Sequence, residues 1–278
     1  MKKIIVPVDF SDIASDALDF AIDFNKKAKG QLILLHIMEM PSYSFSVIGE
    51  VNAHQPEIFL TGKLIEGVKA RLEEWSQRVK SANQEVITKM KFGNPYNFIS
   101  KEISEEEADL VIIGSRGASG LSEIFVGSNT ERVIRMAECP VITVKGPSKI
   151  EDMKNIVFAT DLSEEQDWLA QRAKDVQELL GKKMHIVKVI TPRNFLTTKI
   201  VRQQLDDFSE RNMFENVSLN SIKAEFSEEG ILEFAEDVGA GLIILGTHGR
   251  TGLGHFIGGS KAEDVANHAH IPIITLKI

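Results

Sequence analysis

The sequence is poor in cysteine, tryptophan and tyrosine. Its 278 residues include one cysteine, two tryptophans and two tyrosines. A single cysteine excludes an intrachain disulfide, so the chain is not a small secreted domain held together by disulfides. One cysteine fits the reducing environment of the cytoplasm, and we expect a cytoplasmic protein.

Long apolar runs and an excess of basic charge are also missing. No apolar run approaches the length of about 18 residues that indicates a transmembrane helix. The N-terminal sequence MKKIIVPVDF has too short an apolar run for a signal peptide and reads as a first strand. The formal net charge of −8 at pH 7 argues against a general nucleic-acid binder. We therefore expect neither a membrane nor nucleic acid among its partners.

The composition is otherwise that of an ordinary globular protein, with 43% hydrophobic and 26% charged residues. Its length suggests two domains, each large enough to bury a core. We place the first at residues 1–147 (half one) and the second at 152–278 (half two), joined by a linker around the Gly-Pro turn at 146–147.

One stretch of the chain occurs twice. Residues 111–145 and 243–277 align without a gap, and each reads as an apolar run, a glycine-rich loop, a helix and a second apolar run. The matched pairs include Gly114 with Gly246, Gly117 with Gly249, Gly127 with Gly259, and Ser128 with Ser260. An apolar strand that opens through glycines onto a helix N-terminus is suited to holding phosphate.

Apolar strands alternate with helical patterns before this stretch in both halves. Strands are predicted at 3–8, 31–38, 85–91, 155–160, 184–190 and 217–226, and helices at 12–30, 63–81, 95–107, 163–181, 197–213 and 229–238, with a long loop at 41–60. Nearly continuous apolar inner strands indicate a parallel sheet covered on both faces. The predicted fold is α/β, with two tandem five-stranded parallel sheets flanked by helices, of Rossmann-like or flavodoxin-like type.

In such sheets, ligands bind beyond the carboxyl ends of the strands, where the strand order reverses. The first and fourth strands of each half are the natural pair at that point. They end at Asp9 and Gly114 in half one, and at Asp161 and Gly246 in half two.

The duplicated spacing Gly, two residues, Gly, nine residues, Gly-Ser, together with the aspartate after the first strand, resembles the universal stress protein family. The resemblance covers essentially the whole chain, as two tandem copies on the adenine nucleotide alpha hydrolase type of scaffold. ATP-binding members have this glycine pattern, so the resemblance implies ATP as ligand, alone or with Mg²⁺. In those members the aspartate meets the ribose, the backbone after the second strand meets the adenine, and the glycine loop wraps the phosphates.

Carried over residue by residue, the resemblance implies two sets of nucleotide contacts. In half one they are Pro7, Val8, Asp9, Ile37, Ile113, Gly114, Arg116, Gly117, Gly127, Ser128, Asn129 and Thr130. In half two they are Ala159, Thr160, Asp161, Val189, Leu245, Gly246, His248, Gly249, Gly259, Ser260 and Lys261.

Simpler roles are open for several of these residues. Ser128 and Ser260 each stand three residues before a glutamate, which is the spacing of a helix capping box. Ser163 and Gln166 have the same spacing, and a capping box is predicted there too. The two aspartates can hydrogen-bond their own loops, the residues at the loop tips can be solvated, and the glycines can serve tight turns. Cys139 has no His or Asn frame around it and is expected to be a small buried hydrophobe. The histidines of half two lack the spacing of a metal site, and no metal site is expected.

The expected function is a regulatory protein of the stress response that binds adenine nucleotides, with no catalytic residues identified. One alternative is a ligand-free scaffold that acts through a dimer-like interface, and another is a weak ATPase. Strands 141–145 and 273–277 are expected to pair the halves as an internal pseudo-dimer, with a homodimer as a further option. The SGGxDS loop of ATP pyrophosphatases is absent, since the first strand ends in Val8-Asp9-Phe10-Ser11.

Overall fold

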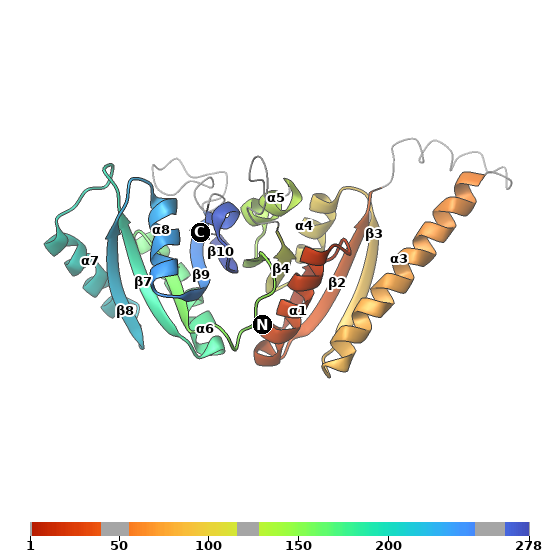
Figure 1. The fold of residues 1–278 in the computed structure, drawn as a ribbon, viewed down its shortest axis with the longest axis horizontal. Helices are drawn as coiled ribbons and strands as arrows, with labels where there is room; N and C mark the ends of the chain where they lie inside the picture. Colours follow the sequence, from red (N-terminus) through yellow and green to blue (C-terminus); the bar gives the residue numbers. More distant parts are fainter. Residues whose placement is uncertain (1, 40–55, 116–127, 248–264, 278) are drawn as a thin grey trace.

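The computed structural model describes residues 2–39, 56–115, 128–247 and 265–277, with the backbone alone at 56–61, 128, 129 and 136 (Figure 1). Among these residues, no helix is long and apolar enough to cross a membrane.

Half one alternates strands and helices as predicted. Ser11 caps the helix that begins at Asp12, because its Oγ accepts a hydrogen bond of 3.3 Å from the Ala14 amide, and Pro95 occupies the first turn of the helix that begins there. The strands are β1 Lys3–Pro7, β2 Gln31–Met38, β3 Val86–Phe92, β4 Leu110–Gly114 and β5 Val141–Val144. The helices are α1 Asp12–Ala28, α3 Pro56–Ser81, α4 Pro95–Glu106 and α5 Ser128–Met136.

Half two follows the same order. Its strands are β6 Asn155–Ala159, β7 Lys183–Ile190, β8 Val217–Lys223, β9 Ala240–Thr247 and β10 Ile273–Lys277. Its helices are α6 Asp167–Leu180, α7 Thr198–Arg211 and α8 Ser227–Asp237, with a 3₁₀ turn η1 at Glu164–Gln166, and residues 265–268 are also helical.

Two local predictions were wrong. The predicted loop at 41–60 ends earlier, because α3 already begins at Pro56, a residue whose fixed φ suits a first helical turn. Ser163 and Gln166 do not form the predicted capping box, since the Ser163 side chain makes no cap bond. Gln166 instead accepts a hydrogen bond from the Thr160 hydroxyl, 2.5 Å away.

The ten strands form one sheet in the order β3-β2-β1-β4-β5-β10-β9-β6-β7-β8. All neighbours are parallel except β5 and β10, which pair antiparallel with Ile142 opposite Ile274. The predicted α/β fold with five parallel strands in each half is confirmed, and the two sets are joined edge to edge. The predicted pairing of 141–145 with 273–277 is therefore confirmed as well.

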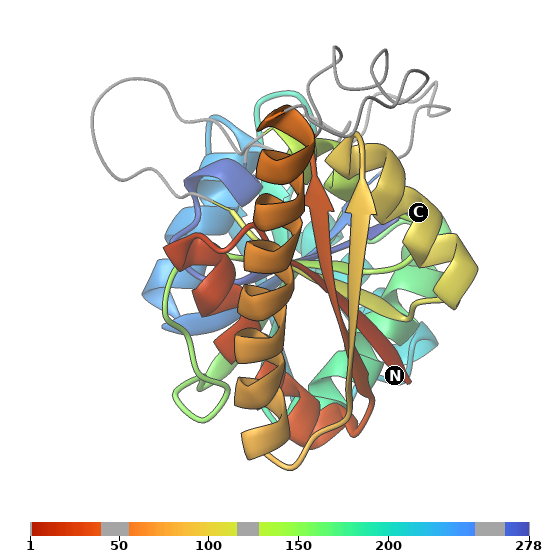
Figure 2. The same cartoon turned by 90° about the vertical axis from the view of Figure 1, so that its right-hand side faces the viewer.

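Helices cover both faces of this sheet. In Figure 2, α3 and α4 lie on opposite sides of β2 and β3. Helices α1, α3, α6 and α7 enclose one hydrophobic core, which includes Phe24 and Phe208. Helices α4, α5 and α8 and residues 265–268 enclose the other, which includes Ile103 and Ile231. Each core contains residues of both halves and so runs across the β5–β10 junction.

The segment that joins the halves is itself packed into the protein. Ile150 and Met153 are 4% and 3% exposed. The Ile150 amide donates to Asp23 Oδ2 on α1, 2.7 Å away. Met153 lies so close to Gly241 that a Cβ there would be 2.5 Å from its Cγ. The linker therefore fixes the two halves against each other.

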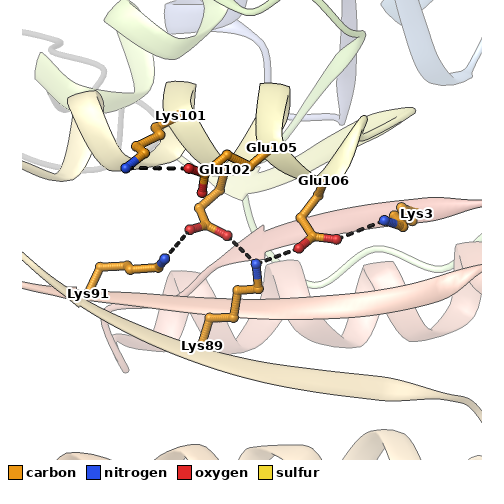
Figure 3. A network of polar contacts seen from close by, with 7 residues as sticks. All are labelled: Lys3, Lys89, Lys91, Lys101, Glu102, Glu105 and Glu106. Atoms are coloured by element: carbon orange, nitrogen blue, oxygen red, sulfur yellow. Dashed lines mark hydrogen bonds and ion pairs between the residues drawn. The ribbon is translucent and has the colours of Figure 1, made fainter.

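One layer of half one is held by ions rather than by apolar packing (Figure 3). Glu102 of α4 is fully buried, and its carboxylate lies 2.5 Å from Lys89 Nζ and 2.6 Å from Lys91 Nζ of β3. Glu106 lies 2.6 Å from Lys89 and 2.8 Å from Lys3 of β1. We call these five residues the ionic layer.

Candidate functional site

In half one, the strand order reverses between β1 and β4. These two strands are neighbours, with Ile5 paired to Val111, so their carboxyl ends lie side by side. Asp9 follows β1 and is exposed. Its Oδ1 accepts bonds from the Ser11 amide at 2.9 Å and the Ser11 hydroxyl at 2.6 Å. Its Oδ2 has no hydrogen-bond partner in the described part of the chain.

Half two repeats this turn. β6 and β9 are neighbours, with Ala159 paired to Leu245. Asp161 Oδ1 accepts from the Ser163 amide at 2.9 Å. In both halves the residue after the aspartate has a positive φ, 65° at Phe10 and 68° at Leu162. The simpler role of these aspartates, bonding their own loop, is thus present in both halves and occupies one carboxylate oxygen of each.

Beneath the turn of half one lies a stack of rings. His36 Nδ1 is 2.7 Å from the Val8 carbonyl, and its ring stacks on Phe10 with 4.6 Å between centroids. The Arg71 guanidinium of α3 lies 4.4 Å from the centre of the Phe10 ring, on which the edge of Trp75 packs. Phe10, Arg71 and Trp75 were not among the predicted site residues, because nothing in their spacing points to this turn.

Beneath the turn of half two lies a buried lysine. Lys188, which corresponds to His36, is 7% exposed. Its Nζ donates to the Asp161 carbonyl at 3.0 Å and to Gln204 Oε1 at 2.8 Å. Burial lowers the pKa of Lys188, and the Asp161 charge opposes that shift. The turn of half two is therefore held by the chain's own ammonium group.

Three more side chains of half two form hydrogen bonds near the carboxyl ends of β6 and β7. The Thr160 hydroxyl donates to Gln166, in place of the apolar pair Val8 and Ala14 found in half one. Asn194 Nδ2 donates to the Val189 carbonyl at 3.2 Å, the backbone expected to face adenine. No side chain in the described part of half one donates to the corresponding Ile37 carbonyl.

The glycine side of half one is built around Gly114. A Cβ on this residue would lie 2.6 Å from the Ile13 carbonyl, so α1 approaches β4 as closely as only glycine permits. Thr130 is buried, and its hydroxyl lies 3.4 Å from the Gly114 carbonyl. Helix α5 therefore starts at the carboxyl end of β4, as the phosphate-binding prediction requires.

The other predicted residues divide into three groups. Ser128 and Asn129 are the first two residues of α5, where the backbone alone is described. Buried or half-buried at the carboxyl ends of the strands are Pro7, Val8, Ile37, Ile113, Ala159, Thr160, Val189, Leu245 and Gly246. Outside the described residues lie Arg116, Gly117, Gly127, His248, Gly249, Gly259, Ser260 and Lys261.

An open cavity of about 560 Å³ lies elsewhere in half one. It sits at the amino ends of the strands, and its lining includes Lys2, Asn25, Lys26, Lys29, Gln84 and Glu85. It shares no residue with the predicted site. Among the described residues, no three His, Cys, Asp or Glu side chains come together to hold a metal ion. Cys139 is buried as predicted, and burial raises the pKa of its thiol to about 12.

The comparisons with known proteins agree on one family. The sequence profile of the universal stress protein family matches residues 1–145 and 221–277. The unmatched residues 146–220 include Asp161, Lys188, Val189 and Asn194. The matched residues 221–277 include the described end of β9, with Leu245 and Gly246, and the glycine-rich stretch that follows it in the sequence.

Individual relatives cover either one half or the whole chain. Two proteins of Methanocaldococcus jannaschii match about half of it: Universal stress protein MJ0531 is 30% identical over 155 residues, 53% of this chain and 84% of that protein. Universal stress protein MJ0577 is 32% identical over 153 residues, 52% of this chain and 94% of that protein. A solved universal stress protein of Archaeoglobus fulgidus has a TM-score of 0.77 at 21% identity, covering 99% of this chain and 98% of that one.

Proposed function

The chain belongs to the universal stress protein family, and we propose that it binds an adenine nucleotide, ATP, in half one, as a regulatory protein of the stress response. The observation that carries this proposal is the reversal of strand order between β1 and β4. This reversal brings Asp9 close to Gly114 and the start of α5. One carboxylate oxygen of Asp9 has no partner in the described part of the chain. A carboxylate suits the ribose hydroxyls, and a helix N-terminus suits the phosphates.

Half two is the weaker site in this proposal. At the carboxyl ends of β6 and β7, where the ribose and the adenine would lie, the side chains of Lys188, Gln166 and Asn194 form hydrogen bonds within the chain. A nucleotide there would compete with these contacts, and each displaced hydrogen bond costs about 1 kcal/mol. We therefore expect one tightly bound nucleotide per chain. Mg²⁺ would accompany the phosphates, held largely by phosphate oxygens and water, as is usual for this ion.

The alternative of a ligand-free scaffold has less support. Its interface would be the antiparallel strand pair, which here lies inside the chain between β5 and β10. β5 is paired on its other side with β4, and β10 with β9. This pair therefore has no open edge for a second copy, and a homodimer would need another surface.

The test is calorimetric titration of the purified chain with ATP, adenosine and cAMP, preceded by denaturation to detect co-purified nucleotide. A universal stress protein has been solved in complex with cAMP, which is why that ligand is included. We expect ATP to bind at one site per chain. Absence of both bound nucleotide and binding heat would refute the proposal. Sustained ATP turnover faster than about 1 per second would favour the enzyme alternative.

A further inference from the structure

Lys145 is a half-buried cation at the carboxyl end of β5. Its Nζ lies 2.9 Å from the hydroxyl of Ser115, which directly follows Gly114 at the end of the neighbouring β4. Ser115 is 2% exposed, and its amide donates to the Val144 carbonyl, so its position is fixed by the sheet. Burial lowers the pKa of Lys145 to about 8. No carboxylate pairs with this ammonium group in the described part of the chain.

Other half-buried lysines of half one are neutralised. Lys89 and Lys91 each lie within 2.6 Å of a glutamate oxygen of the ionic layer. Withdrawing an ammonium group from water is costly unless an opposite charge compensates for it. Among the described residues, Lys145 has only a neutral hydroxyl as partner, in a chain whose formal net charge is −8. Its position therefore favours an anion as an additional partner.

A second source of positive potential lies at the same corner. The first turn of α5 reaches Gly114 through the Thr130 hydroxyl, one residue from Ser115. The free amides of a helix N-terminus carry partial positive charge and bind anions. The nearest acidic residue of that helix, Glu131, is paired with Arg135 at 3.0 Å. The Lys145 ammonium group and the N-terminus of α5 thus both lie at the carboxyl end of β4, where the nucleotide's phosphates are expected.

Resting on the nucleotide site proposed above, we propose that Lys145 binds the terminal phosphates of a nucleoside di- or triphosphate in half one. Ser115 holds the ammonium group in position when the ligand is absent. Half two has a corresponding lysine, but its hydroxyl partner is engaged differently. Lys277 corresponds to Lys145 and Thr247 to Ser115, yet the Thr247 hydroxyl lies 3.4 Å from the Leu276 carbonyl.

The experiment is a calorimetric series with adenosine, AMP, ADP and ATP on the full chain and on Lys145→Gln. Loss of a charge-assisted bond to phosphate should weaken ADP and ATP about 10-fold or more. Adenosine affinity should stay within about twofold, since it carries no phosphate. The matched control, Lys277→Gln, should leave the whole series unchanged, and Lys145→Arg should retain part of the ATP affinity because it keeps the charge.

The outcomes separate the two proposals. If the wild-type chain binds ATP and Lys145→Gln binds it equally well, the lysine assignment is overturned while the nucleotide site stands. If the wild-type chain binds no nucleotide at all, both are overturned. Circular dichroism checks that each variant folds. Should Lys145→Gln fail to fold, Ser115→Ala serves instead, and it must weaken ATP but not adenosine.

Discussion

The layer between α4 and β3 in half one is ionic, whereas the corresponding layer between α8 and β8 in half two is built from uncharged residues. The five residues of the ionic layer, Lys3, Lys89, Lys91, Glu102 and Glu106, correspond to Asn155, Asn220, Ile222, Phe234 and Val238. In half two, the Phe234 ring packs edge-on against His185, with 6.2 Å between centroids. Both layers hold a helix on the same strand arrangement.

The difference teaches which half is fragile. A buried ion pair contributes little net stability compared with apolar packing, because desolvation offsets the attraction. Removing one partner, however, leaves the remaining charges uncompensated and is costly. We therefore expect that replacing all the charges of the ionic layer together costs less stability than removing one of them.

The largest expected effect follows from removing Glu102, which is fully buried between two lysines. We expect Glu102→Ala to lower the free energy of unfolding by about 3 kcal/mol, because Lys89 loses its innermost partner. Urea denaturation measures this change. The control is Glu105→Ala, whose side chain is 47% exposed and pairs with Lys101 at 3.4 Å. It should cost less than about 0.5 kcal/mol.

A graft from half two sharpens the same comparison. Combining Lys3→Asn, Lys89→Asn, Lys91→Ile, Glu102→Phe and Glu106→Val replaces all five residues of the ionic layer by their uncharged counterparts. We expect the graft to be about as stable as the wild-type chain at neutral pH. A loss as large as that of Glu102→Ala would mean that the two layers are not interchangeable.

The next expected effect is that the stability contributed by the ionic layer depends on pH. Hydrogen bonds from Lys3 and then Lys89 lower the pKa of Glu106 to about 2, below its ordinary value of 4.5. A group with a lowered folded-state pKa stabilises the fold above its unfolded-state pKa and loses that contribution as pH falls. The stability of the wild-type chain relative to the graft should therefore fall between pH 4.5 and pH 2. The measurement is the urea concentration at the unfolding midpoint of each protein across that pH range. A constant difference between the two midpoints would contradict this account.

Much of this architecture was predictable, because it follows from local patterns. The apolar run 31–38 between Gly30 and the next turn coincides with β2. The side-chain contacts that distinguish the two sites were not predictable from the sequence. Gln166 has the spacing of a capping box, and only the fold shows that the Thr160 hydroxyl competes for it. Ser115 and Lys145 are far apart in sequence and meet because β4 and β5 pair.

A smaller expected effect, on nucleotide binding in half two, concerns Asn194. Its amide donates to the Val189 carbonyl, where half one leaves Ile37 without a side-chain donor in the described residues. Asn194→Ala removes that competitor, and a displaced bond of about 1 kcal/mol corresponds to about fivefold in affinity. We expect a second, weaker ATP site to become measurable by calorimetry. An unchanged stoichiometry and affinity would show that Asn194 does not limit half two.

The most direct test of the account compares Asp9→Asn with Asp161→Asn by ATP calorimetry. Asparagine keeps an oxygen for the loop bonds that Asp9 makes to Ser11 and removes only the charge. Asp9→Asn should weaken ATP about 10-fold, the cost of exchanging a charged for a neutral hydrogen bond. Asp161→Asn should change it less than about twofold. Equal losses in both variants, or a loss confined to Asp161→Asn, would contradict the claim that half one carries the nucleotide.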